Sequence, residues 1–469
     1  MRTTFAGSFG SHMVLQRAPQ RAVLWGFTDA SGGAISIALG TITLLASLQP
    51  YNASALTWRA VLPPTVAANG TNGSPVSHTL RLLKNGTVRA QLDDVLFGDV
   101  WVCSGQSNMA FLLEMDMDGA RLVQEANHHP SLRFFTTRKL TSNVPLPELP
   151  CVSGDTDPGG CTEEPWSVSS NVSVSDHRGS TSLDDDWLYM SAVCYLYGLE
   201  LLTALGVPVG LVNTNWGGTV IEDWLPAAAN AECTPHAARE MVEAEAEAET
   251  ETEVASAAAA VGRLEVSTHL YNAMVAPLLN LTIRGVVWYQ GESNAQAPHR
   301  YACQIQALVR HWRRAWHEGS GGETSAAFPF GIVQLAGCTS SNDTAATFGF
   351  TALRWAQTAG LGTLPNARMP HTFLATTYDL GDATSPYGSV HTRYKQEIAR
   401  RLGLSSRAIA YGDSSVFAGP RFVSASLDKA AATVTLQLAD TGEGGMALTP
   451  MRLSAMFPQA RALCRCMRM

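Results

Sequence analysis

From Val95 onward the sequence alternates short apolar runs with longer stretches of helical pattern. The apolar runs, which we interpret as buried strands, are Val95-Leu-Phe-Gly-Asp-Val-Trp-Val-Cys, Val207-Pro-Val-Gly-Leu-Val-Asn, Ile283-Arg-Gly-Val-Val-Trp-Tyr, Phe330-Gly-Ile-Val-Gln-Leu and Thr372-Phe-Leu-Ala-Thr. Candidate helices span 189–205, 301–316 and 395–404. Strands that alternate with helices predict a parallel sheet with helices on both faces. Because ligands bind beyond the carboxyl ends of such strands, we expect functional residues directly after the apolar runs.

We place this α/β region at residues 93–411, between two regions of different pattern. Residues 1–92 carry apolar, alternating runs between Gly, Asn and Pro turns, which predicts an N-terminal β-sandwich. Strand patterning returns in 412–469, where we expect an incomplete C-terminal β region. The Pro-, Gly- and Ser-rich segment 142–187 indicates a long surface loop, and the acidic, low-complexity segment 241–265 indicates a solvated spacer without assigned function.

Composition excludes several classes of protein. The net charge of -8 argues against a nucleic-acid-binding protein, which would present a basic face. No apolar stretch is long enough to predict a membrane-spanning helix. The nine cysteines are scattered without repeated C-x-x-C pairs, which argues against a zinc site, although Cys151 and Cys161 could close a short disulfide loop. We expect neither a metal nor an organic cofactor.

Seven N-x-Ser/Thr sequons indicate a protein of the secretory route, at Asn52, Asn69, Asn72, Asn85, Asn171, Asn280 and Asn342. The N-terminal residues lack the apolar run of a signal peptide. We therefore expect a secreted, lysosomal or other lumenal protein whose leader is not part of this sequence. Chance occurrence in a chain rich in Ser and Thr is the alternative.

Polar residues follow three of the predicted strands. In Gly98-Asp-Val-Trp-Val-Cys-Ser-Gly-Gln-Ser-Asn-Met109, Ser107 lies at a strand end, where it is a candidate nucleophile or simply a turn or helix-capping residue. Met109 replaces the second glycine of a G-x-S-x-G elbow. The glycine pair in Asn213-Thr-Asn-Trp-Gly-Gly-Thr219 suits an oxyanion hole or a plain turn, and the amides in Gly285-Val-Val-Trp-Tyr-Gln-Gly-Glu-Ser-Asn294 could also donate to an oxyanion.

The fourth candidate is His391, which lies in a loop ahead of a predicted helix. A late histidine is the expected base for an early serine in many hydrolases, although any one of the 12 histidines is a weak candidate by itself.

Together these blocks resemble the SGNH hydrolases, and more closely the sialate O-acetylesterase family of carbohydrate acetylesterases. The matching sequence segments occur in the same order as in the family, over residues 8–425. They are His12-Met-Val-Leu-Gln-Arg, Val95-Leu-Phe-Gly-Asp-Val-Trp, Ser104-Gly-Gln-Ser-Asn-Met, Tyr189-Met-Ser-Ala-Val-Cys, Trp216-Gly-Gly-Thr, Leu270-Tyr-Asn-Ala-Met, Gly285-Val-Val-Trp-Tyr-Gln-Gly-Glu-Ser-Asn and Ser385-Pro-Tyr-Gly-Ser-Val-His.

The resemblance implies a flavodoxin-like catalytic sheet with β-sandwich segments at both ends. It implies that Ser107 is the nucleophile, that His391 is the base, and that Gly218, Gln290 and Asn294 line the oxyanion or substrate site. The expected activity is cofactor-free hydrolysis of O-acetyl esters of sialic acids. The alternatives are an esterase for another acetylated carbohydrate such as xylan, and a glycan-binding protein with a decayed site. The oligomeric state is not predicted.

The sequence departs from the family pattern at two places. Many SGNH enzymes carry an Asp two or three residues before the base, where this chain has Gly388 and Ser389. The acid could be Asp382 or Asp379, or it could be absent, which would leave a Ser-His dyad. The family's C-terminal β domain is also longer and better patterned than residues 413–469.

The sequons generate the first testable prediction. Native material should carry glycans at several of the seven sites, because proteins that pass through the secretory lumen meet the glycosylation machinery there. Enzymatic deglycosylation should then increase electrophoretic mobility. Unchanged mobility of native material would contradict the expected lumenal location.

Overall fold

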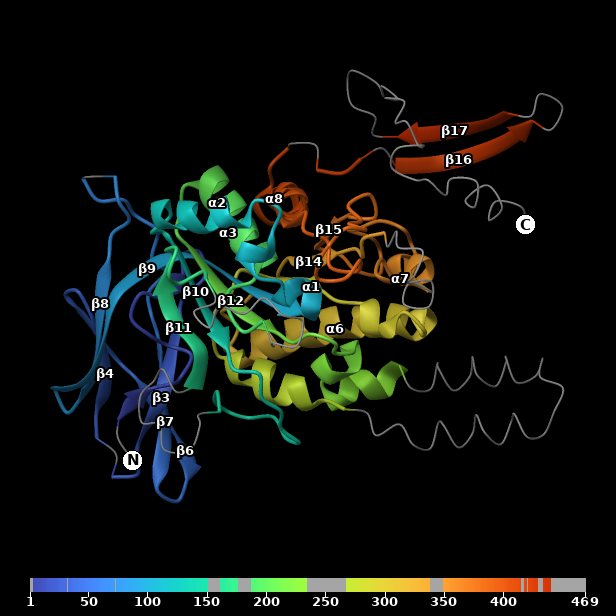
Figure 1. The fold of residues 1–469 in the computed structure, drawn as a ribbon. Helices are drawn as coiled ribbons and strands as arrows, with labels where there is room; N and C mark the ends of the chain where they lie inside the picture. The colour runs from blue at the N-terminus through green and yellow to red at the C-terminus, as the bar shows by residue number, and fades with distance from the viewer. Residues whose placement is uncertain are drawn as a thin grey trace, which may run out of the picture.

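The computed structural model describes residues 3–150 apart from 32 and 72, and then 161–175, 187–233, 267–337, 349–414, 417–419, 421–428 and 433–439. These residues form a mixed α/β structure with a large mixed sheet and a separate antiparallel sheet at the N-terminal side (Figure 1). The predicted acidic spacer and Cys151 lie outside the described residues, whereas Cys161 is disulfide-bonded.

The five strands predicted for the α/β region are present, and a further strand at 132–137 was not predicted. The first nine strands are β1 (Thr4–Phe5), β2 (Val14–Gln16), β3 (Val23–Asp29), β4 (Ile35–Leu39), β5 (Ile42–Leu45), β6 (Ser47–Asn52), β7 (Ala55–Val61), β8 (His78–Lys84) and β9 (Thr87–Gly105). The later strands are β10 (Leu132–Thr137), β11 (Thr162–Val168), β12 (Val209–Asn215), β13 (Gly285–Tyr289), β14 (Phe330–Val333), β15 (Thr372–Ala375), β16 (Arg421–Asp428) and β17 (Thr433–Ala439). The helices used below are α1 (Ser107–Ala110), α2 (Gly119–Glu125), α3 (Ala192–Leu205), α6 (Pro298–Gly319), α7 (Phe350–Ala356) and α8 (Lys395–Tyr411), with the short helices η1 (Leu113–Met115), η4 (Ile221–Trp224) and η7 (Glu292–Asn294).

The large sheet has the strand order β11-β10-β12-β9-β13-β14-β15 along its main path. All neighbours on this path are parallel except β10 and β11, so the prediction of a wholly parallel sheet was wrong at this edge. β11 also lies inside the segment predicted as a surface loop. Its Thr-Glu-Glu-Pro sequence looks like a loop, but an edge strand tolerates proline because one side of it needs no ladder hydrogen bonds.

The two faces of the sheet bury different side chains, because alternate residues of a strand point to opposite sides. Cys103 of β9 forms a disulfide with Cys194 of α3, and the Trp101 ring packs edge-on against Tyr197 of the same helix. Trp288 of β13 points the other way and packs against Trp312 of α6. In Figure 1, α3 and α8 accordingly lie on one side of the sheet and α6 on the other.

Four of the N-terminal strands, β2, β4, β5 and β8, are continuous with the large sheet through β9. This strand has 19 residues, pairs with β8 near its beginning, and ends at the centre of the parallel sheet. It therefore runs through the predicted boundary at residue 92. Strands β1, β3, β6 and β7 form the separate antiparallel sheet, and β16 and β17 form a hairpin in the predicted C-terminal β region.

The register of the central strands brings three of the sequence blocks together. Gly105 at the end of β9 lies opposite Asn215 of β12 on one side and Tyr289 of β13 on the other. The chain then continues into Ser107, the glycine pair and Gln290, respectively. A second disulfide, Cys233–Cys303, ties the segment after β12 to α6. None of the described helices is long and apolar enough to cross a membrane.

Candidate active site

The turn that presents Ser107 depends on a glycine. Gly105 has a φ of +143°, and a Cβ on this residue would lie 2.0 Å from the carbonyl oxygen of Tyr289, so a larger residue would collide with β13. Gln106 follows and donates its backbone N–H to the same carbonyl over 3.0 Å. Ser107 then begins the short helix α1, with its side chain at the carboxyl edge of the sheet.

Ser107 and His391 are in direct contact. The Nε2 atom of His391 lies 2.8 Å from the Oγ atom of Ser107, and its Nδ1 atom lies 2.6 Å from the carbonyl oxygen of Tyr387. A carbonyl oxygen can only accept a hydrogen bond, so Nδ1 carries the proton of the neutral ring. Nε2 is therefore the acceptor that faces the serine hydroxyl, which is the tautomer that a general base requires.

The loop around His391 holds the imidazole in this orientation. The backbone N–H of His391 donates to the carbonyl of Gly388. The backbone carbonyl of His391 accepts from the Ser385 hydroxyl over 2.6 Å. The Trp187 ring packs against the imidazole with the ring centres 5.2 Å apart. Burial lowers the pKa of His391 to about 4, because the charged form of the ring would be poorly solvated, and the nearby Lys395 cation acts in the same direction.

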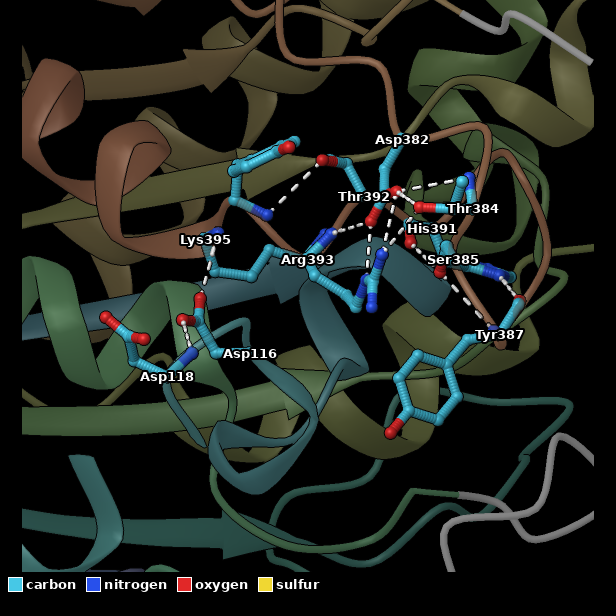
Figure 2. A network of polar contacts seen from close by, with 11 residues as sticks. Asp116, Asp118, Asp382, Thr384, Ser385, Tyr387, His391, Thr392, Arg393 and Lys395 are labelled. Atoms are coloured by element: carbon cyan, nitrogen blue, oxygen red, sulfur yellow. Dashed lines mark hydrogen bonds and ion pairs between the residues drawn. The ribbon is translucent and has the colours of Figure 1, made fainter. Parts of the chain in front are cut away.

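The predicted catalytic acid does not lie beside the base. Asp382 accepts hydrogen bonds from the Arg393 guanidinium at both carboxylate oxygens, and Thr384 donates to it as well. Burial alone would raise the pKa of Asp382, but these hydrogen bonds hold it below its usual value. Figure 2 shows the Arg393 guanidinium directed at Asp382, whereas His391 bonds to the Tyr387 carbonyl. The other predicted acid, Asp379, pairs with Arg401.

The acid prediction therefore needs correction: the group at Nδ1 of His391 is a backbone carbonyl. The physical reason is that each aspartate pairs with an arginine, and the buried carboxylate of Asp382 in particular is stable only when it is paired. The geometry is that of a Ser-His dyad.

Of the two glycines after β12, Gly217 lies against Ser107. A Cβ on Gly217 would lie 3.4 Å from the Cβ of Ser107, which places the Gly217 backbone against the serine. Gly218, the residue predicted from the sequence, has a φ of +74°, and a Cβ there would contact nothing within 4 Å. Gly218 thus allows the turn, because only glycine adopts this conformation readily, while Gly217 makes the close approach.

The two predicted amide donors brace this turn instead of facing the serine. Gln290 is fully buried and uses its Nε2 donors on the carbonyl of Thr219 and on Oδ1 of Asn294. Asn294 donates to Glu222 over 2.8 Å and accepts from the backbone N–H of Ile221. Both side chains therefore support the segment that carries the glycine pair, and Gln290 has no amide hydrogen left for an oxyanion.

Two residues of the Ser104-Gly-Gln-Ser-Asn block have roles that the sequence did not suggest. The Gln106 side-chain oxygen accepts from the backbone N–H groups of Gly291 and Ser293, and so joins the serine turn to the end of β13. Asn108 bonds to Glu292 and to the carbonyl of Val390. The only sign in the sequence of these roles is that Gln106 and Asn108 lie on either side of Ser107.

The Asp382 assignment can be tested by mutation. Asp382→Asn should change the rate at which a fluorophosphonate labels Ser107 by less than about tenfold, because no carboxylate contacts the imidazole; removing a true triad acid lowers the rate about 10⁴-fold. Asp379→Asn serves as the matched variant, and thermal unfolding verifies that both are folded. A thousandfold loss in folded Asp382→Asn would contradict the dyad.

The lowered pKa of His391 predicts an unusual acid limb. The ring must be neutral to accept the serine proton, so the rate of Ser107 labelling should stay high below pH 6.5 and fall to half only near the folded pKa of about 4. Circular dichroism at each pH distinguishes this loss from acid unfolding. A midpoint near pH 6.5 would show that burial does not depress the pKa of this histidine.

Comparison with known proteins identifies the family of the chain. A family model described as a carbohydrate esterase, sialic acid-specific acetylesterase, matches residues 193–341. The chain is 36% identical over 430 residues to the sialate O-acetylesterase of Mus musculus, covering 89% of this chain and 75% of the mouse protein. For the Homo sapiens enzyme the identity is 35% over 419 residues, with 89% and 73% covered.

A solved structure shows the same fold over most of the chain. The crystal structure of a carbohydrate acetylesterase from Xanthomonas citri is similar with a TM-score of 0.67 and 27% identity, and the match covers 95% of this chain and 84% of that one. With relatives of this identity over most of its length, the chain belongs to the sialate O-acetylesterase family of carbohydrate esterases.

Proposed function

We propose that the chain is a serine esterase that hydrolyses O-acetyl esters of sialic acids and releases acetate. The observation that carries the proposal is the 2.8 Å contact between Ser107 Oγ and the unprotonated Nε2 of His391. Family membership supports the substrate class, since the matching model and the mammalian relatives are described by activity on sialic acid acetyl esters.

The proposed reaction is a two-step acyl transfer. His391 Nε2 takes the proton of the Ser107 hydroxyl while Oγ attacks the acetyl carbonyl carbon. The tetrahedral intermediate collapses, the C–O bond to the sugar breaks, and Nε2 returns the proton to the departing sugar oxygen. A water molecule, deprotonated by the same imidazole, then attacks the acetyl-serine. As the bond between Oγ and the acetyl carbon breaks, Nε2 returns this proton to Oγ, which frees Ser107 and releases acetic acid that ionises to acetate.

The oxyanion of each intermediate needs fixed donors. We assign this role to the backbone N–H groups around Ser107 and Gly217, because the first N–H groups of a helix have no partner within it and the Gly217 backbone lies against the serine. The Tyr387 carbonyl takes the place of a carboxylate at Nδ1 and keeps the base in its working tautomer. The SGNH-type assignment is supported by the sheet: the strands β12-β9-β13-β14-β15 have the flavodoxin-like order 2-1-3-4-5 when β10, a further parallel strand beside β12, is left out of the count.

A second candidate substrate is another acetylated carbohydrate. The Xanthomonas citri relative is described as a carbohydrate acetylesterase without reference to sialic acid, and its likeness to this chain extends over both proteins. A non-catalytic glycan-binding role is the third alternative, against which the intact Ser107–His391 contact argues.

We also propose a lumenal or secreted location. Its support is the set of sequons together with the two disulfides of the described residues, Cys103–Cys194 and Cys233–Cys303, since disulfides persist in oxidising compartments. The deglycosylation measurement tests it.

Acetate release from a panel of O-acetylated sialic acids and acetylated xylan tests the function. The sialic acid esters should be hydrolysed with the higher kcat/KM. Ser107→Ala and His391→Ala should each lower kcat by about 10³-fold or more, and the double variant should be little worse, because the two residues act as a unit. Preference for xylan would favour the second candidate, and absence of hydrolysis or of Ser107 labelling would favour the third.

A further inference from the structure

Lys395 is a fully buried lysine in the first turn of α8, four residues after the proposed base. Its Nζ atom lies 4.5 Å from the ring centre of Phe111 and 5.2 Å from that of Tyr289. A buried ammonium is expensive unless it is paired or hydrogen-bonded, so a lysine here calls for an explanation. Its side-chain hydrogen-bond partner is Oδ1 of Asn108, the residue that follows Ser107.

The Asn108 amide is a junction between three segments. Its Nδ2 atom donates to Oε1 of Glu292 and to the carbonyl of Val390 over 2.8 Å, while Oδ1 accepts from Lys395. Both acceptors require the NH₂ side of the amide, and the ammonium requires the oxygen side. The orientation of Asn108 is therefore determined by partners from η7, from the His391 loop and from α8.

This junction links the two reacting side chains. Asn108 is the neighbour of Ser107 on one side of the contact, and Val390 is the neighbour of His391 on the other. We propose, building on the function above, that Lys395 is a positioning residue that holds the Asn108 side chain and thereby sets the geometry between Ser107 Oγ and His391 Nε2.

Charged groups around the junction define its electrostatics. Glu292 at the start of η7, Asp116 after η1 and Asp382 in the His391 loop face Lys395. Arg393 pairs with Asp382. The Asp116 carboxylate also accepts the backbone N–H of Lys395 over 3.0 Å, a contact drawn in Figure 2. Burial lowers the pKa of Lys395 to about 7, which these carboxylates oppose, and the Lys395 cation in turn lowers the pKa of His391.

Lys395→Met tests the proposal, because methionine keeps much of the length of the side chain but has neither charge nor donor. The kcat for acetyl ester hydrolysis should fall by about 10–100-fold with KM nearly unchanged, as expected for a small displacement of reacting groups. The acid limb of the pH profile should also move to higher pH, because His391 loses a nearby positive charge. A residue that only fills space would not move this limb.

Lys84→Met is the matched control. Lys84 is a second buried lysine, 8% exposed, which pairs with Asp29 over 2.7 Å in the N-terminal strands. This variant should lose stability while keeping the kcat and pH profile of the wild type. Lys395→Met that folds and retains both wild-type kcat and the wild-type acid limb would overturn the proposal.

A second variant decides the case if Lys395→Met does not fold. Asn108→Asp keeps the acceptor for Lys395 but removes both donors, so kcat should fall by a similar factor; unchanged kcat would overturn the proposal. Ser107 labelling by a fluorophosphonate, measured in parallel, separates the two hypotheses. Labelling of the wild type without acetyl ester hydrolysis would contradict the proposed function, while slower labelling of either variant would still support the positioning role.

Discussion

The pairing of β9 with β12 on one side and β13 on the other is the constraint on which the site depends. Parallel strands end at the same edge of a sheet, so the turns that follow these three strands must meet there. Gly105 lets the turn after β9 lie close to the end of β13, since any Cβ at this position would collide with the Tyr289 carbonyl. The hydrogen bonds of Gln106 and Gln290 then tie the turns to one another.

Replacing a carboxylate by a carbonyl at the base changes the electrostatics of the site. A carbonyl orients the imidazole as well as an aspartate does, but it carries no charge with which to stabilise the imidazolium that forms during acyl transfer. The buried surroundings and the Lys395 cation disfavour that ion by more than the hydrogen bond to the Tyr387 carbonyl favours it, which accounts for the lowered pKa of His391. Such a base is ready to act over a wide acidic range but pulls less strongly on the serine proton, because a lower pKa means lower basicity.

Buried polar residues hold the segments that carry the proposed reacting side chains. Gln290, Asn294 and Glu222 hold the glycine turn, and Lys395, Asn108 and Glu292 hold the two loops that carry the reacting side chains. The geometry of the Ser107–His391 contact thus depends on residues outside the pair itself.

The sequence by itself determined the order of β9, β12, β13, β14 and β15 with their helices, and the location of Ser107 and the glycine pair at strand ends, but not β10. The assignment of His391 came from the family resemblance. These features follow from local patterns: apolar runs, turn-forming glycines and the order of blocks along the chain. Only the tertiary structure decided that Gly217 makes the close approach to the serine, that Gln290 and Asn294 brace the turn, and that β11 is a strand. The tertiary structure also decided that Asp382 pairs with Arg393 and not with His391, and that the Tyr387 carbonyl lies at Nδ1 of His391. Every residue has a backbone carbonyl, so the sequence gives no sign of which carbonyl will bond to His391. That choice depends on distances between segments, which are set only when the chain folds.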